Sequence, residues 1–214
     1  FTAERLRAYA EYVVMEEWDP VSIPDGVSDE QAALCEPCAV TVHAVRLSSL
    51  KLGDSVAVLG AGPIGLFCIQ VAKAAGASMV LVSEPAPARA EAALKAGADA
   101  VFDPTNKDII EEMVALTAGL GPDVVFECAA AKSTLDDAFK LARRGGQIVL
   151  IALAWEPTSV LPVDWAAREV RFQASFGSLP EDWLISLELI RSGTINMDLL
   201  LSEAGFIPLD EIQG

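Results

Sequence analysis

A short apolar run that leads directly into a glycine-rich turn and then a helix is the feature that most restricts the fold of this chain. Val56-Ala-Val-Leu59 has the composition of a buried strand, Gly60-Ala-Gly-Pro-Ile-Gly65 supplies the turn, and the stretch from Leu66 to Ala75 reads as the helix. A glycine triad at this spacing is weak on its own, but here it lies between a strand and a helix. This order predicts the first strand–turn–helix unit of an α/β protein.

The three glycines and one later carboxylate together predict a dinucleotide site. Gly60 would permit the tight turn, Gly62 would let the pyrophosphate approach the backbone, and Gly65 would let helix and strand pack closely. Glu84 ends the next apolar run, at the position where an acidic residue accepts hydrogen bonds from the adenosine ribose. This favours NAD over NADP, although Arg89 lies near enough to bind a 2′-phosphate. The alternative is that the glycines only form a tight connection in some other α/β protein.

Short apolar runs and amphipathic helices alternate through the rest of the chain. Runs that are apolar on both faces and separated by helices are typical of a parallel sheet covered on both sides. The pattern predicts a doubly wound, six-stranded parallel Rossmann sheet, with helices that end at Gly76, Gly97, Gly119 and Gly145. The predicted strands are 55–59, 79–83, 100–102, 123–128, 147–152 and 170–175, and the helices between them are 64–75, 88–96, 107–118 and 134–141.

The segments that flank this alternation have a different character. The run from Ala10 to Met15 reads as a strand, and Ser28 with Gln31 forms a capping box that predicts a helix over 29–34. A second helix is expected over 39–50, and another over 180–190 after the sixth strand. The chain begins with Phe1 and ends inside an apparent helix start, so we expect it to be part of a longer protein.

Composition excludes several classes of function. With 31 acidic and 15 basic residues the formal charge is −16, which disfavours partners such as nucleic acid or an anionic membrane. The uncharged stretch 55–72 contains Pro63 and several glycines, which suit a strand, turn and buried helix better than a membrane span. Four cysteines are too few for a disulfide framework in a chain of this size, which predicts a reducing, cytoplasmic location.

Several stretches resemble the zinc-dependent alcohol dehydrogenases of the medium-chain dehydrogenase/reductase superfamily. The Glu36-Pro37 pair is the most discriminating, because it resembles the polyol, butanediol and threonine dehydrogenase branch rather than the zinc-free quinone reductases. The matching stretches, which span most of the chain in the family's order, are Ala10-Glu-Tyr-Val-Val14, Ile23-Pro-Asp-Gly-Val-Ser28, Ala33-Leu-Cys-Glu-Pro37, Val42-His-Ala-Val45, Gly60-Ala-Gly-Pro-Ile-Gly65, Ala72-Lys73, Gly97-Ala-Asp99 and Gly145-Gly146.

The resemblance implies a division into three parts. Residues 1–35 would be the end of the first segment of a GroES-like, mainly β catalytic domain. Residues 36–178 would form the dinucleotide-binding Rossmann domain, and 179–214 a junction helix with the start of the return to the catalytic domain. The family's catalytic residues, an early zinc-binding Cys and a His-Glu pair, would lie upstream of Phe1. A homodimer or homotetramer, paired through strands beyond Leu150, is implied as well.

The resemblance also assigns roles to individual residues. Glu36 matches the acidic position beside the catalytic zinc, whereas chemistry alone would make it a solvated or capping group. Two departures add bulk near the expected nicotinamide path, since Cys128-Ala-Ala-Ala131 and Ala152-Leu153 stand where the family has glycines. The implied cofactor contacts, with those named above, are Gly60, Gly62, Pro63, Ile64, Gly65, Glu84, Arg89, Ile151, Ala152, Leu153, Ser175 and Phe176.

Two other candidate features are weaker. Cys35 and Cys38 have the spacing of half a zinc site or of a redox pair, but no second pair exists and the redox context is missing. We expect small buried thiols, and Cys35 contacting the metal site stays open. His43, the single histidine, is expected to be a packed helix residue rather than a catalytic base.

The combined hypothesis is an NAD-dependent oxidoreductase. Zinc would act as a Lewis acid on an alcohol or polyol, whose carbinol hydride would pass to nicotinamide. The 214 residues alone are expected to bind NAD weakly and to turn nothing over. Two alternatives are a zinc-free, NADPH-dependent enone or quinone reductase, and a domain that binds or senses NAD without chemistry.

Overall fold

The computed structural model describes residues 11–17, 20–201, 207–208 and 211. Within these residues, a single sheet of six parallel strands has the order β3-β2-β1-β4-β5-β6. The predicted doubly wound parallel sheet is therefore confirmed. Its strands are β1 (Ser55–Leu59), β2 (Met79–Ser83), β3 (Ala100–Phe102), β4 (Val124–Glu127), β5 (Gln147–Leu150) and β6 (Arg171–Ala174).

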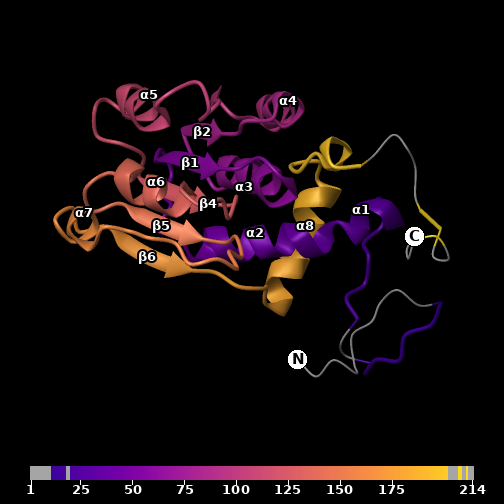
Figure 1. Cartoon of the computed structure of the whole chain (residues 1–214). Coiled ribbons are helices and arrows are strands. Elements are labelled where there is room, and N and C mark those ends of the chain that lie inside the picture. Colours follow the sequence, from indigo (N-terminus) through magenta and orange to yellow (C-terminus); the bar gives the residue numbers. More distant parts are fainter. Residues whose placement is uncertain (1–10, 18–19, 202–206, 209–210, 212–214) are drawn as a thin grey trace.

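Helices cover both faces of the sheet, as Figure 1 shows. Helices α2, α3, α4 and α8 pack on one face, and α5, α6 and α7 pack on the other. Their bounds are α1 (Asp29–Ala33), α2 (Cys35–Leu47), α3 (Pro63–Ala74), α4 (Pro87–Lys95), α5 (Ile109–Leu116), α6 (Thr134–Leu141), α7 (Pro162–Ala166) and α8 (Pro180–Arg191), followed by the 3-10 turn η1 (Met197–Leu199).

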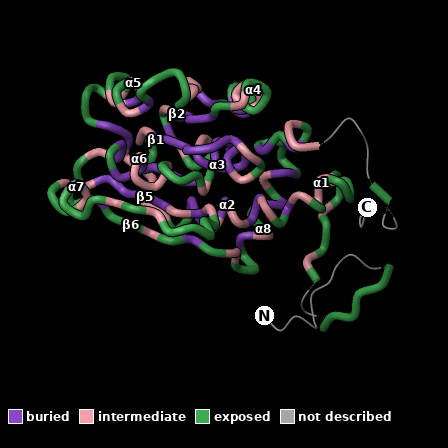
Figure 2. The backbone as a smooth tube through the Cα atoms, viewed as in Figure 1, coloured by how far each residue is buried: buried purple, intermediate pink, exposed green. Residues whose placement is uncertain are grey.

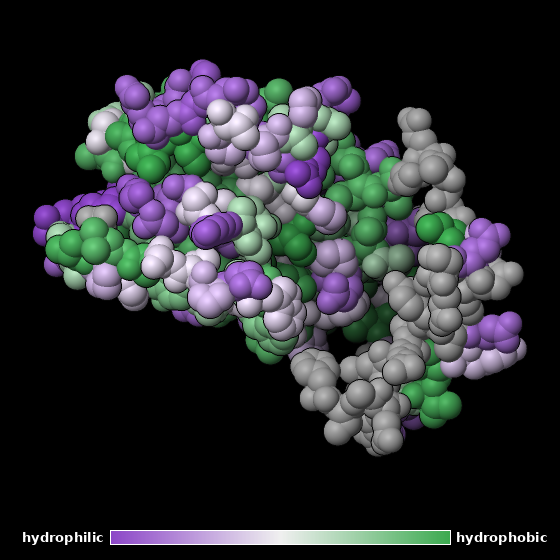
Figure 3. Space-filling model, viewed as in Figure 1, coloured by the Kyte–Doolittle hydropathy of each residue, from purple (hydrophilic) through white to green (hydrophobic). Residues whose placement is uncertain are grey.

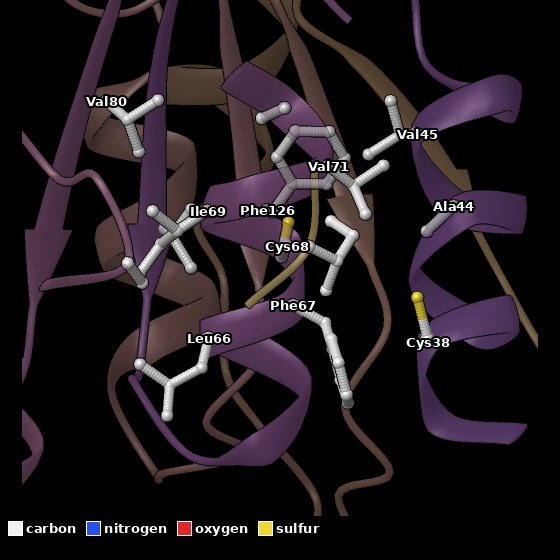
Figure 4. Close-up of a cluster of buried hydrophobic side chains, with 14 of the residues drawn as sticks. Cys38, Ala44, Val45, Leu66, Phe67, Cys68, Ile69, Val71, Val80 and Phe126 are labelled. Atoms are coloured by element: carbon white, nitrogen blue, oxygen red, sulfur yellow. The ribbon is translucent and has the colours of Figure 1, made fainter. Parts of the chain in front are cut away.

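The larger core lies between the sheet and helices α2, α3 and α8. Alternate residues of the strands enter it, such as Val80 of β2 and Phe126 of β4, both of which are fully buried. Figure 4 shows Phe67 and Val71 of α3 between the strands and α2. Because α3 follows the glycine turn, this core fixes the position of that turn relative to the sheet.

The second core contains an aromatic cluster that joins α6, α7 and β6. The rings of Phe139 and Trp165 have centroids 5.0 Å apart, and those of Phe139 and Phe172 are 5.7 Å apart. Trp165 Nε1 also donates to the carbonyl of Val170 at 2.6 Å. Helix α7 was not predicted, because its five residues are too short for a helical period and these tertiary contacts stabilise it.

Two of the four predicted helix ends lie at their glycines. Gly76 and Gly97 directly follow the C-cap residues of α3 and α4 and have positive φ, as expected. Gly119 and Gly145 also have positive φ, but α5 and α6 end earlier, at Leu116 and Leu141. Helix α2 begins at Cys35 and ends at Leu47, whereas 39–50 was predicted. The earlier start places Glu36 in the first turn of the helix, where an acidic side chain interacts favourably with the helix dipole.

The predicted strand over 10–15 is not present in the described residues 11–15, which form no helix or strand. Tyr12 and Val14 are 88% and 98% exposed, and no neighbouring strand pairs with them here. Backbone groups in an extended segment need a partner strand, which a local apolar pattern does not supply. The predicted catalytic-domain remnants and the boundaries 1–35, 36–178 and 179–214 remain predictions.

Exposure is uneven across the sheet and the surface. Figure 2 shows a buried β1 at the centre and a largely exposed β6 at the edge. In Figure 3, hydrophilic side chains cover the surface near α4 and α5. An apolar patch lies over α7, where Leu161 and Val163 are 57% and 60% exposed.

No helix among the described residues is long and apolar enough to cross a membrane.

Candidate functional site

The carboxyl ends of the central strands bring the predicted site residues to one edge of the sheet. Leu59, Glu127, Leu150 and Ala174 are aligned across β1, β4, β5 and β6. The strand order reverses between β1 and β4, and ligands of doubly wound sheets bind outside this reversal point. The turns that follow these four strands therefore surround one candidate crevice.

The three glycines of the first turn each meet a different steric condition. Gly60 has φ +95°, and a Cβ there would lie 2.9 Å from the Cβ of Ala129. A Cβ on Gly65 would overlap the carbonyl oxygen of Gly60, so helix and strand pack too closely for a side chain. A Cβ on Gly62 would meet no atom within 4 Å. The backbone at Gly62 thus faces open space, as close approach of a pyrophosphate requires.

The amino end of α3 is left uncapped beside this open space. Gly62 is its N-cap residue, Pro63 occupies the first helical position, and the first turn contains neither a side-chain cap nor an acidic residue. In α5, by contrast, Asp108 accepts hydrogen bonds from the amides of Ile110 and Glu111. Free amides and the positive end of the helix dipole favour an anion at the start of α3.

Glu84 is buried at the end of β2 and holds the glycine turn. One of its oxygens accepts a hydrogen bond from the amide of Ala61 at 2.8 Å. The other accepts from the amide of Ala86 at 2.9 Å and from Arg89 Nε at 3.0 Å. Glu84 and Arg89, two of the predicted cofactor-binding residues, therefore lie together, and the guanidinium of Arg89 is bound to the carboxylate of Glu84. This link between β2 and the glycine turn was not foreseen from the spacing of Glu84.

The predicted contacts after β5 and β6 lie at the same edge with different exposure. Ile151 and Ser175 are 6% and 5% exposed. Leu153 and Phe176 are 56% and 71% exposed, and Ala152 is half-buried between them. The buried members pack at the edge, and the exposed members leave apolar surface there; their contact with a cofactor stays a prediction.

Glu127 is a candidate residue that the sequence analysis missed. It is 1% exposed at the end of β4, and its Oε1 accepts hydrogen bonds from the amides of Ala129 and Ala130 and from Thr134 Oγ1. Its Oε2 and the hydroxyl oxygen of Ser175 are buried without a hydrogen-bond partner within the described part of the chain. The available signal was a carboxylate that closes the apolar run 124–127, where burial demands several donors.

Glu36 and the two nearby cysteines form no complete metal site. Glu36 is exposed in the first turn of α2, while Cys35 and Cys38 are 2% and 0% exposed. Burial, with a smaller effect of the Glu36 charge, raises the pKa of Cys35 to about 11, and burial raises that of Cys38 to about 12. The expected small buried thiols are therefore confirmed, and a contact of Cys35 with a metal site stays a prediction.

A zinc ion would need ligands from elsewhere. No group of three or more His, Cys, Asp or Glu side chains suited to a metal exists among the described residues. Zinc sites use three or four protein ligands. The residues described here do not fit zinc by themselves, so the role of Glu36 stays a prediction.

His43 joins two helices. Its Nδ1 lies 2.8 Å from an oxygen of Asp182 in α8, and Arg46 of α2 bonds the other oxygen. The side chain of Asp182 is fully buried and also accepts from the amide of Leu179 at 2.7 Å. This places His43 in a helix-to-helix contact, as expected of a packed residue.

The strand order defines a doubly wound α/β domain of the Rossmann type, and comparison with known proteins gives its family. Residues 63–192 match the family described as zinc-binding dehydrogenase, and the chain belongs to that family. The match covers the chain from the start of α3 to the end of α8.

Similar proteins include enzymes that act on polyols and diols. Sorbitol dehydrogenase of Bacillus subtilis is 32% identical over 197 residues, which are 92% of this chain and 56% of that protein. The crystal structure of 2R,3R-butanediol dehydrogenase from Bacillus subtilis has 35% identity and a TM-score of 0.79, over 84% of this chain and 51% of that one. A Sinorhizobium meliloti structure, described as a putative zinc-binding dehydrogenase bound to NADP, has 34% identity and a TM-score of 0.78 over 84% and 54%. The chain thus spans about half the length of these relatives.

Proposed function

We propose that this chain is the cofactor-binding part of an NAD-dependent alcohol or polyol dehydrogenase of the zinc type. The observation that carries the proposal is the open backbone at Gly62 beside the uncapped start of α3. A diphosphate is the ligand that such free amides and such open space suit. Family membership and the polyol and diol relatives support hydride chemistry on an alcohol.

The residues of this chain would bind and orient the cofactor. The amides at the start of α3 would hold the diphosphate, and Glu84 would accept hydrogen bonds from the adenosine ribose. Ala152, Leu153 and Phe176 would shield the nicotinamide half from water. The bound nicotinamide would supply the hydride chemistry. Glu36 would contribute to a zinc site completed by residues that the described part of the chain does not hold.

The state of Arg89 supports NAD over NADP. Its guanidinium is paired with the buried carboxylate of Glu84, with Nη2 2.9 Å from Oε1. A 2′-phosphate would lie beside the negative charge of Glu84, and the guanidinium that could neutralise it is already paired with that carboxylate. Binding of NADP is therefore disfavoured. A relative at 34% identity that binds NADP makes the NADPH-dependent reductase the alternative to test.

The test is a cofactor and substrate screen on the intact protein. We expect reduction of NAD, in preference to NADP, with polyols or secondary alcohols, and loss of activity after chelation of zinc. A zinc-free protein that reduces enones with NADPH would establish the alternative. A protein that binds NAD tightly and oxidises no alcohol would instead be a sensing domain.

Gly62→Ala tests the site within this chain. The added Cβ meets no atom, and φ is negative there, so we expect an unchanged unfolding midpoint. The Cβ occupies the space of the diphosphate, so NAD affinity should fall by about tenfold or more. Adenosine, which lacks phosphate, should bind both forms equally. Equal NAD affinity in the two forms would contradict the proposed diphosphate position.

A further inference from the structure

The buried carboxylate of Glu127 uses only one of its two oxygens. Oε1 receives three donors, from Ala129 N at 3.0 Å, Ala130 N at 2.9 Å and Thr134 Oγ1 at 2.7 Å. Oε2 is equally buried and receives none within the described residues. None of the three donors to Oε1 is a cation. A buried carboxylate oxygen without a donor is costly, so a donor from outside the protein is expected.

Glu127 is also one of the residues that line a cavity. Its volume is about 400 Å³, and it lies between the turn after β4 and the segment after β5. Glu127, Ala130 and Thr134 line one side, and Ala152 and Leu153 line the other. The remaining walls are mostly apolar, with Glu156 and Thr158 as further polar residues. Among the residues that line the cavity, Glu127 is the one with a buried side-chain oxygen that lacks a hydrogen-bond partner within the described part of the chain.

The position of the cavity in the fold indicates which ligand group would enter. Doubly wound sheets consist of two mononucleotide-binding halves on either side of the reversal in strand order. Glu84, at the end of β2, belongs to the half expected to hold adenosine. Glu127, at the end of β4, belongs to the other half and is aligned with Leu59, the residue before the glycine turn. The second half of the cofactor would therefore pass close to Glu127.

We propose that Oε2 of Glu127 accepts a hydrogen bond from the nicotinamide nucleoside half of the bound cofactor. This inference rests on the proposed function and extends it to a named acceptor. The nucleoside offers two kinds of donor, the carboxamide N–H and the ribose hydroxyls. Both are neutral donors that match an acceptor-only carboxylate. Glu127 then both fixes the turn through Oε1 and binds the ligand through Oε2.

Glu127→Gln separates these two tasks. A glutamine retains one oxygen, which the three donors to Oε1 hold in place, and it puts an NH2 group where Oε2 was. The turn keeps its hydrogen bonds, but the ligand donor then faces a donor. Thr134→Val is the comparison variant, because it changes another residue that lines the cavity and removes one donor to Oε1, but leaves Oε2 unchanged.

Affinities are measured on the intact protein by titration calorimetry, together with the unfolding midpoint of each variant. We expect Glu127→Gln to weaken NAD binding by about tenfold or more, and Thr134→Val by less than about threefold. AMP, which lacks the nicotinamide half, should bind all forms equally. Equal NAD affinity in wild type and Glu127→Gln, or equal losses in the two variants, would overturn the proposal.

Two analogues identify the donor. The acetylpyridine analogue of NAD lacks the carboxamide N–H, and ADP-ribose keeps a ribose but lacks the ring. A loss with Glu127→Gln that persists for ADP-ribose assigns a ribose hydroxyl, and a loss that disappears with both analogues assigns the carboxamide. Wild-type protein that binds no dinucleotide would refute the proposed function itself, which is a different result.

A second variant covers a failure of Glu127→Gln to fold. Ala131 is exposed and lines the same cavity, and within the described residues only its backbone carbonyl takes part in a hydrogen bond, as acceptor from the amide and Oγ1 of Thr134. Ala131→Leu narrows the cavity without altering the buried carboxylate. We expect weaker NAD binding with unchanged AMP binding, and unchanged NAD binding would count against a ligand in this cavity.

Discussion

At the scale of the residue, Ala130 is a non-glycine residue of the site whose backbone is in the left-handed region. Its φ is +52°, in the left-handed region, and it lies in the turn held by Glu127. The alanines after β4 stand where the resembled family has a glycine, and added bulk was expected there. The structure shows that the departure also concerns the backbone, because a left-handed alanine costs about 1 kcal/mol more than glycine.

Ala130→Gly should therefore stabilise the protein. We expect the free energy of unfolding in urea to rise by roughly 0.5–1 kcal/mol, since glycine adopts the left-handed conformation without a Cβ penalty. The neighbouring exposed residue provides the control, because Ala131→Gly relieves no positive φ and should be neutral or destabilising. Destabilisation of the same size by both changes would show that the strain is absent in solution.

At the scale of the element, the connection between β1 and α3 depends on two glycines for different reasons. Gly62 faces open space, whereas Gly65 packs against the carbonyl of Gly60. Gly65→Ala should push α3 away from β1 and lower the free energy of unfolding by roughly 1–3 kcal/mol. Thermal and urea unfolding measure this directly. Gly62→Ala is the matched comparison, and an equal loss in the two variants would contradict the close packing at Gly65.

A second element-scale contact, between α2 and α8, should respond to acid. Burial raises the pKa of Asp182, but hydrogen bonds from the Leu179 amide, Arg46 and His43 outweigh it and hold the pKa below its ordinary value. A carboxyl group whose pKa is lowered on folding stabilises the fold fully above its unfolded pKa of about 4. This stabilisation is lost as the pH falls through 4 towards the lowered value.

Asp182→Asn should accordingly cost roughly 2 kcal/mol at pH 7, because it removes hydrogen bonds to a charged group. The difference between wild type and variant should shrink below about pH 4, where the wild-type carboxyl becomes protonated. Urea unfolding at a series of pH values gives the comparison. A difference that stays constant down to pH 3 would mean that the charge of Asp182 contributes no stability.

At the scale of the whole molecule, the outer edge of β6, with which no strand among the described residues pairs, is the feature that bears on assembly. β5 is its sheet neighbour, and the amides of Arg171 and Ser175 donate to the carbonyls of Gly146 and Leu150. Because strand residues alternate, the amide of Ala174 points away from β5. An open edge of this kind is usually covered in native proteins.

We expect the intact protein to be a homodimer or homotetramer that covers this edge. Ala174→Pro removes the outward amide and keeps the amides that pair with β5, so it should shift the protein towards monomer. Light scattering after size exclusion gives the mass, and circular dichroism verifies the fold. A monomeric wild type, or a variant with unchanged mass, would contradict assembly through β6.

The sequence by itself determined the class of fold and most of its elements. The period of the apolar residues predicted six parallel strands, and glycines predicted the ends of α3 and α4, because both signals are local. The spacing of Glu84 from the glycine turn placed the two at the same edge of the sheet for the same reason. The strand predicted over 10–15 is absent from the described residues 11–15, because a strand needs a partner strand that a local pattern does not supply. Helix α7 was not predicted, because it depends on tertiary aromatic contacts.

Only the tertiary structure decided which side chains meet at the site. Ala129 packs against Gly60, and Asp182 joins His43 across 139 positions of sequence. Glu84 turned out to accept a hydrogen bond from the amide of Ala61. Glu127 gained a role because the order of strands puts β4 beside β1. Such contacts depend on which strands become neighbours, and that order is set by packing of the whole sheet, which no local pattern contains.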